Sequence, residues 1–357
     1  MTLGNDRFTD MDGDSDMELA VSVSTGASVY FLDDDLSYNA SVTGIGSGTH
    51  KPMAAGDIDG DGVAELVVGD ASGNAPAFWV MEYNSSSGQY EVVYTHVPPA
   101  QVPVYCIEIA DVDGDGSAEI LRGQQNHECV VSSWDGTNIV DEHTFFLAYN
   151  PYMVRAVDWD GDGEVEIISV DRTTTARVRV YSWTGSAFAA EYTSVDMGEP
   201  LYGFAMADMD GDGGLEMVVS MENYYASYQG VMYMLTSTGP DQYSIYWRGG
   251  FAGRYVYLYD AADWDGDGLM ELAVGSYDFQ TFPRGTFAVT YEWDPDTTTL
   301  VEDWVSHELP YGYSGRARFL DLDGDGDLEL VVPNEGGILY AFSPDDRDWI
   351  MSSGDMG

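Results

Sequence analysis

The feature that most constrains the fold is a nine-residue acidic segment that occurs seven times along the chain. Its pattern is Asp-x-Asp-Gly-Asp-Gly-x-x-Glu, and one copy reads Asp-Ile-Asp-Gly-Asp-Gly-Val-Ala-Glu over residues 57–65. Four carboxylates this close together repel one another unless a cation lies between them. The seven copies begin at Asp10, Asp57, Asp111, Asp158, Asp208, Asp263 and Asp321.

The residue types of each copy are those of a calcium loop. The three aspartates offer single oxygens, the seventh residue offers its main-chain carbonyl, and the glutamate completes the six to eight oxygens that Ca²⁺ prefers. We therefore predict about seven Ca²⁺ sites, each with a structural rather than a catalytic role. Their expected ligands are Asp10, Asp12, Asp14, Asp16 and Glu18; Asp57, Asp59, Asp61, Val63 and Glu65; Asp111, Asp113, Asp115, Ser117 and Glu119; Asp158, Asp160, Asp162, Glu164 and Glu166; Asp208, Asp210, Asp212, Gly214 and Glu216; Asp263, Asp265, Asp267, Leu269 and Glu271; and Asp321, Asp323, Asp325, Asp327 and Glu329.

Glycines at the fourth and sixth places let the backbone curl around an ion through positive φ. The first copy has Ser15 at the sixth place, where the other copies have glycine. A side chain in that conformation is strained, so we expect the first site to be the weakest.

The spacing of the copies predicts a repeat architecture. Successive copies begin 47, 54, 47, 50, 55 and 58 residues apart, and seven units in 357 residues average 51 residues each. Self-similarity at a period near fifty indicates a solenoid or a propeller. The apolar runs that follow the loops, such as Leu66–Val68, are continuous rather than alternating, as in strands covered on both faces.

These observations predict an all-β chain, a seven-bladed β-propeller with four-stranded antiparallel blades. A calcium loop is expected between the first and second strand of every blade. We expect one domain over residues 1–357, with blades at approximately 5–48, 49–100, 101–150, 151–199, 200–252, 253–312 and 313–357.

The charge of the chain argues against a nucleic-acid partner. The net charge is −49, and seven bound Ca²⁺ would still leave it at −35. Such a surface repels nucleic acid at long range, so no nucleic-acid partner is expected. The longest apolar runs are of strand length, far below the roughly 18 residues of a membrane span, so we expect no transmembrane segment.

Two further expectations concern residues inside the blades. Cys106 and Cys129 fall two strands apart, about 9.6 Å, which is too far for a disulfide, so both are expected to be buried free thiols. Five of the seven residues that lie three places before the loops are charged, and we predict that they pair as a ring around a central channel. The seven are Arg7, Ala54, Glu108, Arg155, Ala205, Asp260 and Arg318.

The repeated motif, followed each time by an apolar β-type run, resembles the FG-GAP/VCBS repeats. Their best-known members form the seven-bladed propeller of integrin α-subunits, and the resemblance covers about residues 5–350. It implies the same fold and structural calcium. The loops here end in Glu where those families often have Asp, and the Phe-Gly-x-Gly-Gly-Ala sequence is missing. Integrin-like ligand binding is therefore not implied.

The connections on the face away from calcium are rich in Tyr, Gly and Arg. Tyr and Arg are frequent in binding hot spots. Two interpretations stay open, ligand binding and aromatic plugs that pack over the blades. The candidate binding residues are Tyr152, Tyr224, Tyr225, Tyr228, Trp247, Arg248, Arg254, Tyr277, Arg284, Tyr311, Tyr313 and Arg316.

The function expected from these features is recognition. We expect an extracellular or cell-surface adhesion module that binds a glycan or a protein, and we expect no enzymatic activity. The five histidines, at 50, 96, 127, 143 and 307, show no metal-binding spacing in the sequence. The alternatives are a polysaccharide lyase or hydrolase built on a propeller, and a purely structural domain within a larger surface assembly.

Overall fold

The computed structural model describes most of the chain as strands joined by turns. The described residues are 2–14, 17–23, 28–33, 37–46, 51–72, 78–97, 102–149, 151–171, 173, 175–198, 200–221, 229–252, 255–277, 286–309, 317–322, 324–333, 338–344 and 350–352. They form twenty-eight strands, and no helix occurs among them. The chain divides into two compact units.

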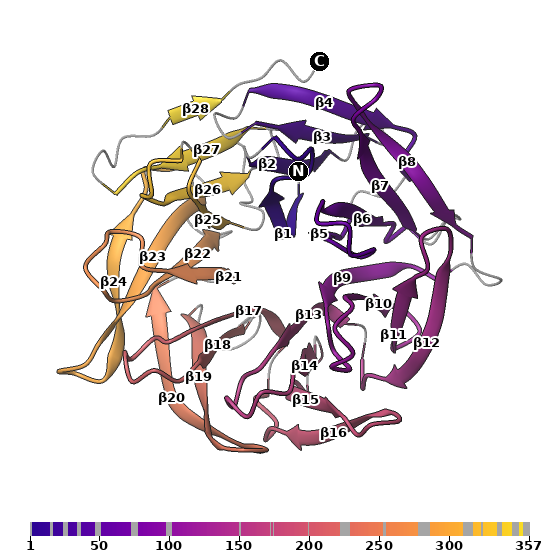
Figure 1. Cartoon of the computed structure of the whole chain (residues 1–357). Coiled ribbons are helices and arrows are strands. Elements are labelled where there is room, and N and C mark those ends of the chain that lie inside the picture. The colour runs from indigo at the N-terminus through magenta and orange to yellow at the C-terminus, as the bar shows by residue number, and fades with distance from the viewer. Residues whose placement is uncertain are drawn as a thin grey trace. The chain divides into compact units, whose positions relative to one another are not determined.

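Unit 1 contains four antiparallel sheets of four strands each. It comprises Met1–Asp158, Gly163–Asp171 and Val178–Thr193. The strands of each sheet are paired in sequence order (Figure 1). They are β1 (Thr2–Thr9), β2 (Glu18–Val23), β3 (Ser28–Leu32) and β4 (Tyr38–Thr43); β5 (Met53–Gly56), β6 (Glu65–Gly69), β7 (Phe78–Asn84) and β8 (Gln89–His96); β9 (Val104–Ala110), β10 (Glu119–Gln124), β11 (Glu128–Trp134) and β12 (Ile139–Phe146); and β13 (Pro151–Val157), β14 (Glu166–Asp171), β15 (Val178–Trp183) and β16 (Phe188–Thr193).

Unit 2 contains three sheets of the same plan. It comprises Trp159–Asp162, Arg172–Arg177 and Ser194–Gly357. Its strands are β17 (Leu201–Ala207), β18 (Glu216–Met221), β19 (Gln229–Gly239) and β20 (Gln242–Ala252); β21 (Tyr255–Ala262), β22 (Glu271–Tyr277), β23 (Thr286–Asp294) and β24 (Thr299–Val305); and β25 (Arg318–Leu320), β26 (Glu329–Pro333), β27 (Leu339–Phe342) and β28 (Ile350–Ser352).

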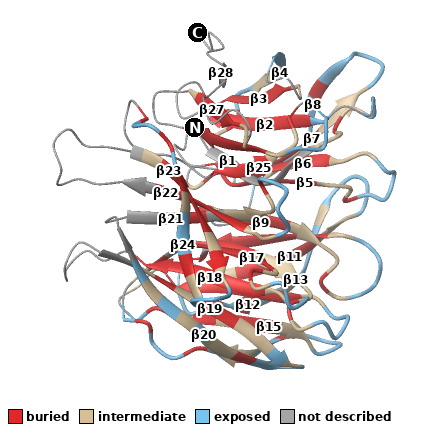
Figure 2. Ribbon diagram, turned by 90° about the vertical axis from the view of Figure 1, so that its left-hand side faces the viewer, coloured by how far each residue is buried: buried red, intermediate tan, exposed pale blue. Residues whose placement is uncertain are grey.

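Burial decreases from the second to the fourth strand of a sheet. Every residue of β6, β10, β14 and β26 is buried, whereas most residues of β8 and β12 are exposed or half-buried. Figure 2 shows the same contrast between β6 or β18 and β20. The continuous apolar runs of the sequence are therefore strands covered on both faces.

Within each unit, the first strands of successive sheets lie against one another. In unit 1, β5 contacts β1 and β9, and β9 contacts β13; in unit 2, β21 contacts β17 and β25. Gly123 of β10 shows how closely neighbouring sheets approach, because a Cβ there would lie 2.6 Å from Cγ of Pro151, which belongs to β13 of the next sheet. The same Cβ would also meet Cys106 Sγ within its own sheet. Seven four-stranded antiparallel sheets packed in this manner are the blades of a β-propeller, which confirms the predicted fold class.

A one-residue bulge interrupts the pairing of the third and fourth strands in six blades. The partner strand carries one extra residue there, while the flanking pairs remain in register. A bulge bends the strand and changes the direction of a side chain. The extra residues are Asn39, Val93, Glu142, Glu191, Tyr246 and Asp303.

The two cysteines lie where the sequence places them. Cys106 on β9 and Cys129 on β11 are both paired with Gly123 on the strand between them, and both are buried free thiols. The prediction of two buried thiols without a disulfide is confirmed.

The structure describes the contacts of four of the five charged residues that were predicted to form a ring. Arg155 Nη1 lies 3.3 Å from Glu108 Oε1, so these two side chains form an ion pair between β13 and β9. Asp260 instead accepts a hydrogen bond of 3.0 Å from the main-chain N–H of Phe319. Arg318 is buried and donates to the carbonyl oxygen of Ala317 at 3.0 Å. The side chain of Arg7 lies outside the described residues.

Candidate metal centre

The loop between β9 and β10 gathers four carboxylates in one place. Asp111, Asp113, Asp115 and Glu119 each offer an oxygen, and these four oxygens all lie within 4.8 Å of one another. The same clustering holds for Asp10, Asp12 and Glu18 in the first loop, and for Asp57, Asp59 and Asp61 in the second. Such an arrangement of hard oxygens is suited to a divalent cation.

Main-chain N–H groups of the loop hold its first aspartate in place. Gly114 N donates to Asp111 Oδ1 at 2.8 Å, and Gly116 N donates to Asp111 Oδ2 at 2.9 Å. The two glycines have φ of +77° and +94°, which a residue with a side chain adopts only under strain. The glycines of the motif are therefore required by the turn around its first aspartate.

The same hydrogen bonds recur in other loops. The sixth-place glycine donates to the first aspartate in five further copies, at 2.9 to 3.1 Å. These pairs are Gly62–Asp57, Gly163–Asp158, Gly213–Asp208, Gly268–Asp263 and Gly326–Asp321. In the first loop, Gly13 N donates to Asp10 Oδ1 at 2.6 Å, while Ser15 and Asp16 lie outside the described residues.

The seventh residue of the motif is held by the fifth-place aspartate. Ser117 N donates to Asp115 Oδ1 at 2.8 Å, and the same bond occurs in four other loops. The other pairs are Val63–Asp61, Gly214–Asp212, Leu269–Asp267 and Asp327–Asp325. These contacts fix the main chain at the residue whose carbonyl was predicted to face an ion. Asp323 lies outside the described residues.

The glutamate that ends the motif closes the loop through a bond that the sequence did not predict. One of its oxygens accepts the N–H of the motif's second residue, at 2.7 to 3.1 Å in six loops. The pairs are Met11–Glu18, Ile58–Glu65, Val112–Glu119, Met209–Glu216, Trp264–Glu271 and Leu322–Glu329. The signal for this bond is the apolar second residue, which is buried in each of these loops.

Burial of the glutamates changes their proton affinity. Desolvation is the main cause that raises the pKa of Glu119 to about 7, and Asp113, Asp111 and Asp115 add repulsion, against the hydrogen bond from Val112. For the same first cause, the pKa is also raised to about 7 in Glu18, Glu65, Glu216 and Glu271. A cation at the loop would favour the ionised form of each glutamate.

Several loop oxygens are buried without a hydrogen-bond partner. They are Asp208 Oδ1, Asp263 Oδ1, Asp321 Oδ1 and Glu271 Oε1. A buried carboxylate oxygen without a partner is costly, because it loses its hydration and gains nothing in return. Three of the four belong to the first aspartate of a loop, where a shared cation would supply the missing interaction. The loops therefore fit a bound Ca²⁺ in both donor type and arrangement.

The fourth loop carries additional contacts around its second aspartate. Asp160 Oδ2 accepts the N–H of Asp241 at 2.7 Å and the hydroxyl of Tyr243 at 3.3 Å. The indole of Trp159 lies against Tyr243, with ring centroids 4.5 Å apart, and its N–H donates to the carbonyl of Leu215 at 2.8 Å. Asp160 is thus oriented from outside its own loop.

The candidate ligand-binding residues are described only in part. The predicted connection after Trp247 is wrong in its placement, because β20 continues to Ala252 in register with β19. Trp247 packs edge-on against Trp293, and the exposed Arg248 lies 5.4 Å above the ring of Tyr233 and donates to its hydroxyl at 3.0 Å. Both side chains are therefore also packing residues, Trp247 against β23 of the next blade and Arg248 within its own sheet.

The other candidates give less information. Tyr152 and Tyr277 belong to β13 and β22, and their side chains are not among those described. The remaining candidates lie outside the described residues, namely Tyr224, Tyr225, Tyr228, Arg254, Arg284, Tyr311, Tyr313 and Arg316. Within the described ranges there is no helix of the length and apolarity that a membrane span requires.

Comparison with known protein families finds a match to one part of the chain. The family described as FG-GAP-like repeat matches residues 158–219. No curated protein matches the sequence significantly.

Solved structures resemble the chain over nearly its whole length. The crystal structure of BBS1N in complex with ARL6DN, soaked with mercury, has a TM-score of 0.62 at 14% identity and covers 99% of this chain and 95% of that one. The crystal structure of Saccharomyces cerevisiae Sqt1 has a TM-score of 0.61 at 9% identity and covers 98% of this chain and 83% of that one. At such identities the likeness concerns the fold alone. The repeat match over residues 158–219 and the seven four-stranded blades together support an FG-GAP-type β-propeller.

Proposed function

We propose that this protein is a calcium-stabilised interaction module that binds a protein partner in a calcium-rich, extracellular setting. The observation that carries the calcium part is the set of buried loop oxygens without partners, on Asp208, Asp263, Asp321 and Glu271. Within their nine-residue motifs every other charged residue is a carboxylate. Ca²⁺ is the ion that such all-oxygen loops favour.

Calcium is proposed to act on folding rather than on chemistry. The unfolded chain lacks the preformed sites, so the free energy of binding becomes free energy of folding. Each occupied site would also remove two units of negative charge from a chain of net charge −49. About seven ions would bind, one for each copy of the motif.

Three observations support an interaction role. Propeller folds usually mediate protein interactions, and one structurally similar protein, BBS1N, was crystallised in complex with a second protein. The Tyr- and Arg-rich segments of the sequence supply residue types that dominate binding hot spots. We propose that these segments form the binding surface, with Arg248 at its described part. A glycan is the second candidate ligand, because exposed Tyr and Trp rings stack on sugars.

The test is a pull-down from the native extracellular fraction, run beside a glycan array, both in calcium and in excess chelator. A protein captured in calcium and lost in chelator supports the proposal, provided that Arg248→Ala weakens capture. Arg179→Ala, which removes a half-buried arginine of β15 that pairs with Asp171, is the control for loss of an arginine elsewhere. Binding to glycans alone would show that the ligand is a sugar and not a protein. Binding that is unchanged in chelator would overturn the calcium requirement.

A further inference from the structure

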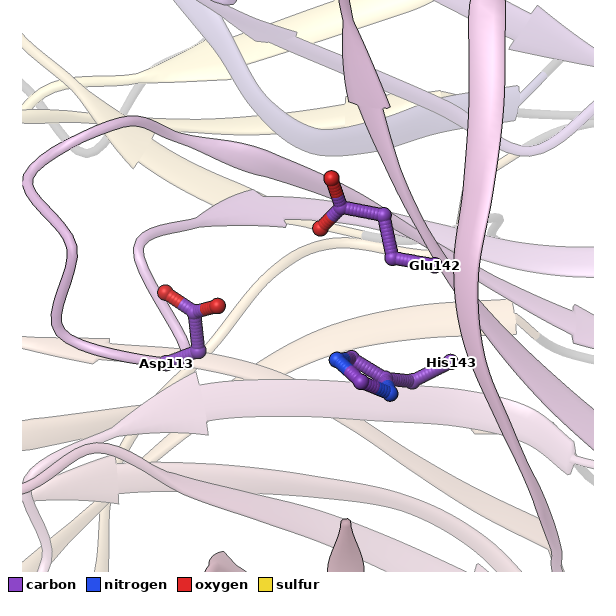
Figure 3. Close-up of side chains that lie close together, drawn as sticks. All are labelled: Asp113, Glu142 and His143. Carbon is purple, nitrogen blue, oxygen red and sulfur yellow. The ribbon is translucent and has the colours of Figure 1, made fainter. Parts of the chain in front are cut away.

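We propose that the third blade binds a second divalent cation, of the first-row transition-metal class, through Asp113, Glu142 and His143. One donor atom from each of these side chains lies within 4.8 Å of the other two. Figure 3 shows Glu142 and His143 extending from the same strand toward the loop that carries Asp113. The group shares Asp113 with the third acidic loop and differs from that loop because it includes an imidazole nitrogen. A carboxylate has two oxygens, so Asp113 can offer one to each ion.

A bulge in β12 brings the two neighbouring side chains to one side. Residues that follow one another along a regular strand point to opposite faces of the sheet. Here Val131 pairs with His143 and Ser132 pairs with Asp141, so Glu142 is the extra residue of the bulge. The bulge turns Glu142 toward the side on which His143 already lies.

Each of the three side chains is oriented by a contact outside the group. Ser133 Oγ donates to Glu142 Oε1 at 2.7 Å, and Asp115 N donates to Asp113 Oδ1 at 3.1 Å. The His143 ring packs against Trp183, with ring centroids 4.5 Å apart, and more distantly against Phe188 at 6.1 Å. Supporting contacts of this kind set ligand orientation before the ion arrives.

The distances and donor types fit a transition-metal ion. Zinc binds His nitrogen and carboxylate oxygen at about 2.0 to 2.2 Å, so ligand atoms on one ion lie roughly 3 to 4 Å apart. The side chains need to close by no more than about 2 Å from their present positions. Imidazole suits Zn²⁺, Cu²⁺ and Ni²⁺, whereas all-oxygen sites suit Ca²⁺ and Mg²⁺.

The other blades provide an internal comparison. The residue after the bulge is Ala40, Tyr94, Tyr192, Trp247 and Trp304 in the five other blades with this bulge. The position after the bulge is therefore aromatic in most of these blades. The imidazole of His143 also packs against aromatic rings, those of Trp183 and Phe188. Packing alone accounts for the ring of His143 but not for the two carboxylates that lie beside its nitrogens.

The test uses Co²⁺ as a spectroscopic probe of the full chain in saturating calcium. Calcium keeps the acidic loops filled, so Co²⁺ absorption with imidazole character reports on the proposed site. The expected result is one Co²⁺ per chain with visible d–d bands, which equimolar Zn²⁺ abolishes by displacement. His143→Phe, which retains an aromatic ring, is expected to remove the bands. Glu142→Gln is expected to weaken Co²⁺ binding by about tenfold or more.

Two controls separate this site from the calcium loops. Glu191→Gln changes the same bulge position in the fourth blade, where Tyr192 follows, and should leave Co²⁺ binding unchanged. Calorimetric titration should show that His143→Phe and Glu142→Gln keep the wild-type number of calcium sites. The proposal is overturned if no visible bands develop, if they survive His143→Phe, or if Glu191→Gln removes them as well. A loss of calcium binding with retained Co²⁺ bands would instead contradict the proposed function alone.

Discussion

Replacing Glu65 by glutamine separates the two roles that the structure gives to this side chain. Glu65 is buried and accepts the N–H of Ile58 at 3.0 Å, while its charge would serve an ion in the loop. Glutamine keeps an oxygen for the Ile58 N–H and removes the charge. The variant therefore isolates the contribution of the cation.

The expected effect of Glu65→Gln changes sign with calcium. With calcium at 100 times its dissociation constant, one site contributes about 2.7 kcal/mol to the free energy of unfolding, and the variant loses most of it. In excess chelator the variant should be the more stable protein, because burial raises the pKa of Glu65 to about 7 and ionisation at neutral pH is costly. After allowance for screening by water at the loop, we expect a gain on the order of 1 kcal/mol.

The assay is urea unfolding of wild type and Glu65→Gln, in saturating calcium and in excess chelator. Glu82→Gln, on β7 of the same blade, controls for loss of charge away from the loop. Equal destabilisation of Glu65→Gln in both conditions would refute the reasoning, since the glutamate would then act only through packing and its hydrogen bond.

Four further predictions test other parts of the structure. In chelator, the melting temperature should fall as pH rises from about 4.5 to about 7, because the folded protein holds the protons of Glu65 and Glu119 more tightly than the unfolded chain. In calcium, the melting temperature should rise over the same pH range, because protons compete with the ion for the carboxylates. Ser15→Gly should strengthen the first calcium site and add about 1 kcal/mol, measured as calcium-dependent stability, because the equivalent Gly62 and Gly116 have φ of +91° and +94°; no change would show that Ser15 is unstrained. Gly123→Ala should cost roughly 1 to 3 kcal/mol in urea unfolding through contact with Cys106 and Pro151, and adding Cys106→Ala should restore part of it. Asp141→Asn should destabilise by on the order of 3 kcal/mol, because the buried Arg122 loses its carboxylate partner, and an unchanged unfolding midpoint would show that Ser132 and Phe78 suffice to hold it.

Local chemistry explains why so much of the fold follows from the sequence. The loop at 57–65 is specified by its own glycines and aspartates, and the buried strand after it, Glu65–Gly69, has the bounds that its apolar run predicts. Each blade repeats this unit, so the period determines the number of blades. Both features depend on residues close together in the chain.

The features that the sequence did not predict depend on pairing between distant residues. Gly249 and Gly250 suggest a loop, yet β20 continues through them because β19 supplies partners at Met232 and Val231. The bulge at Glu142 has no local signature, since it exists only as a register shift against β11. For this reason the histidines show no metal spacing in the sequence, although His143 lies beside two carboxylates in the fold.

The number of calcium ions bound per chain is the decisive measurement for the proposed calcium loops. Isothermal titration of metal-free protein with Ca²⁺, checked by native mass spectrometry, counts the sites that the seven loops are proposed to form. We predict about seven ions, with the weakest bound at the loop that begins at Asp10. Four or fewer would contradict it.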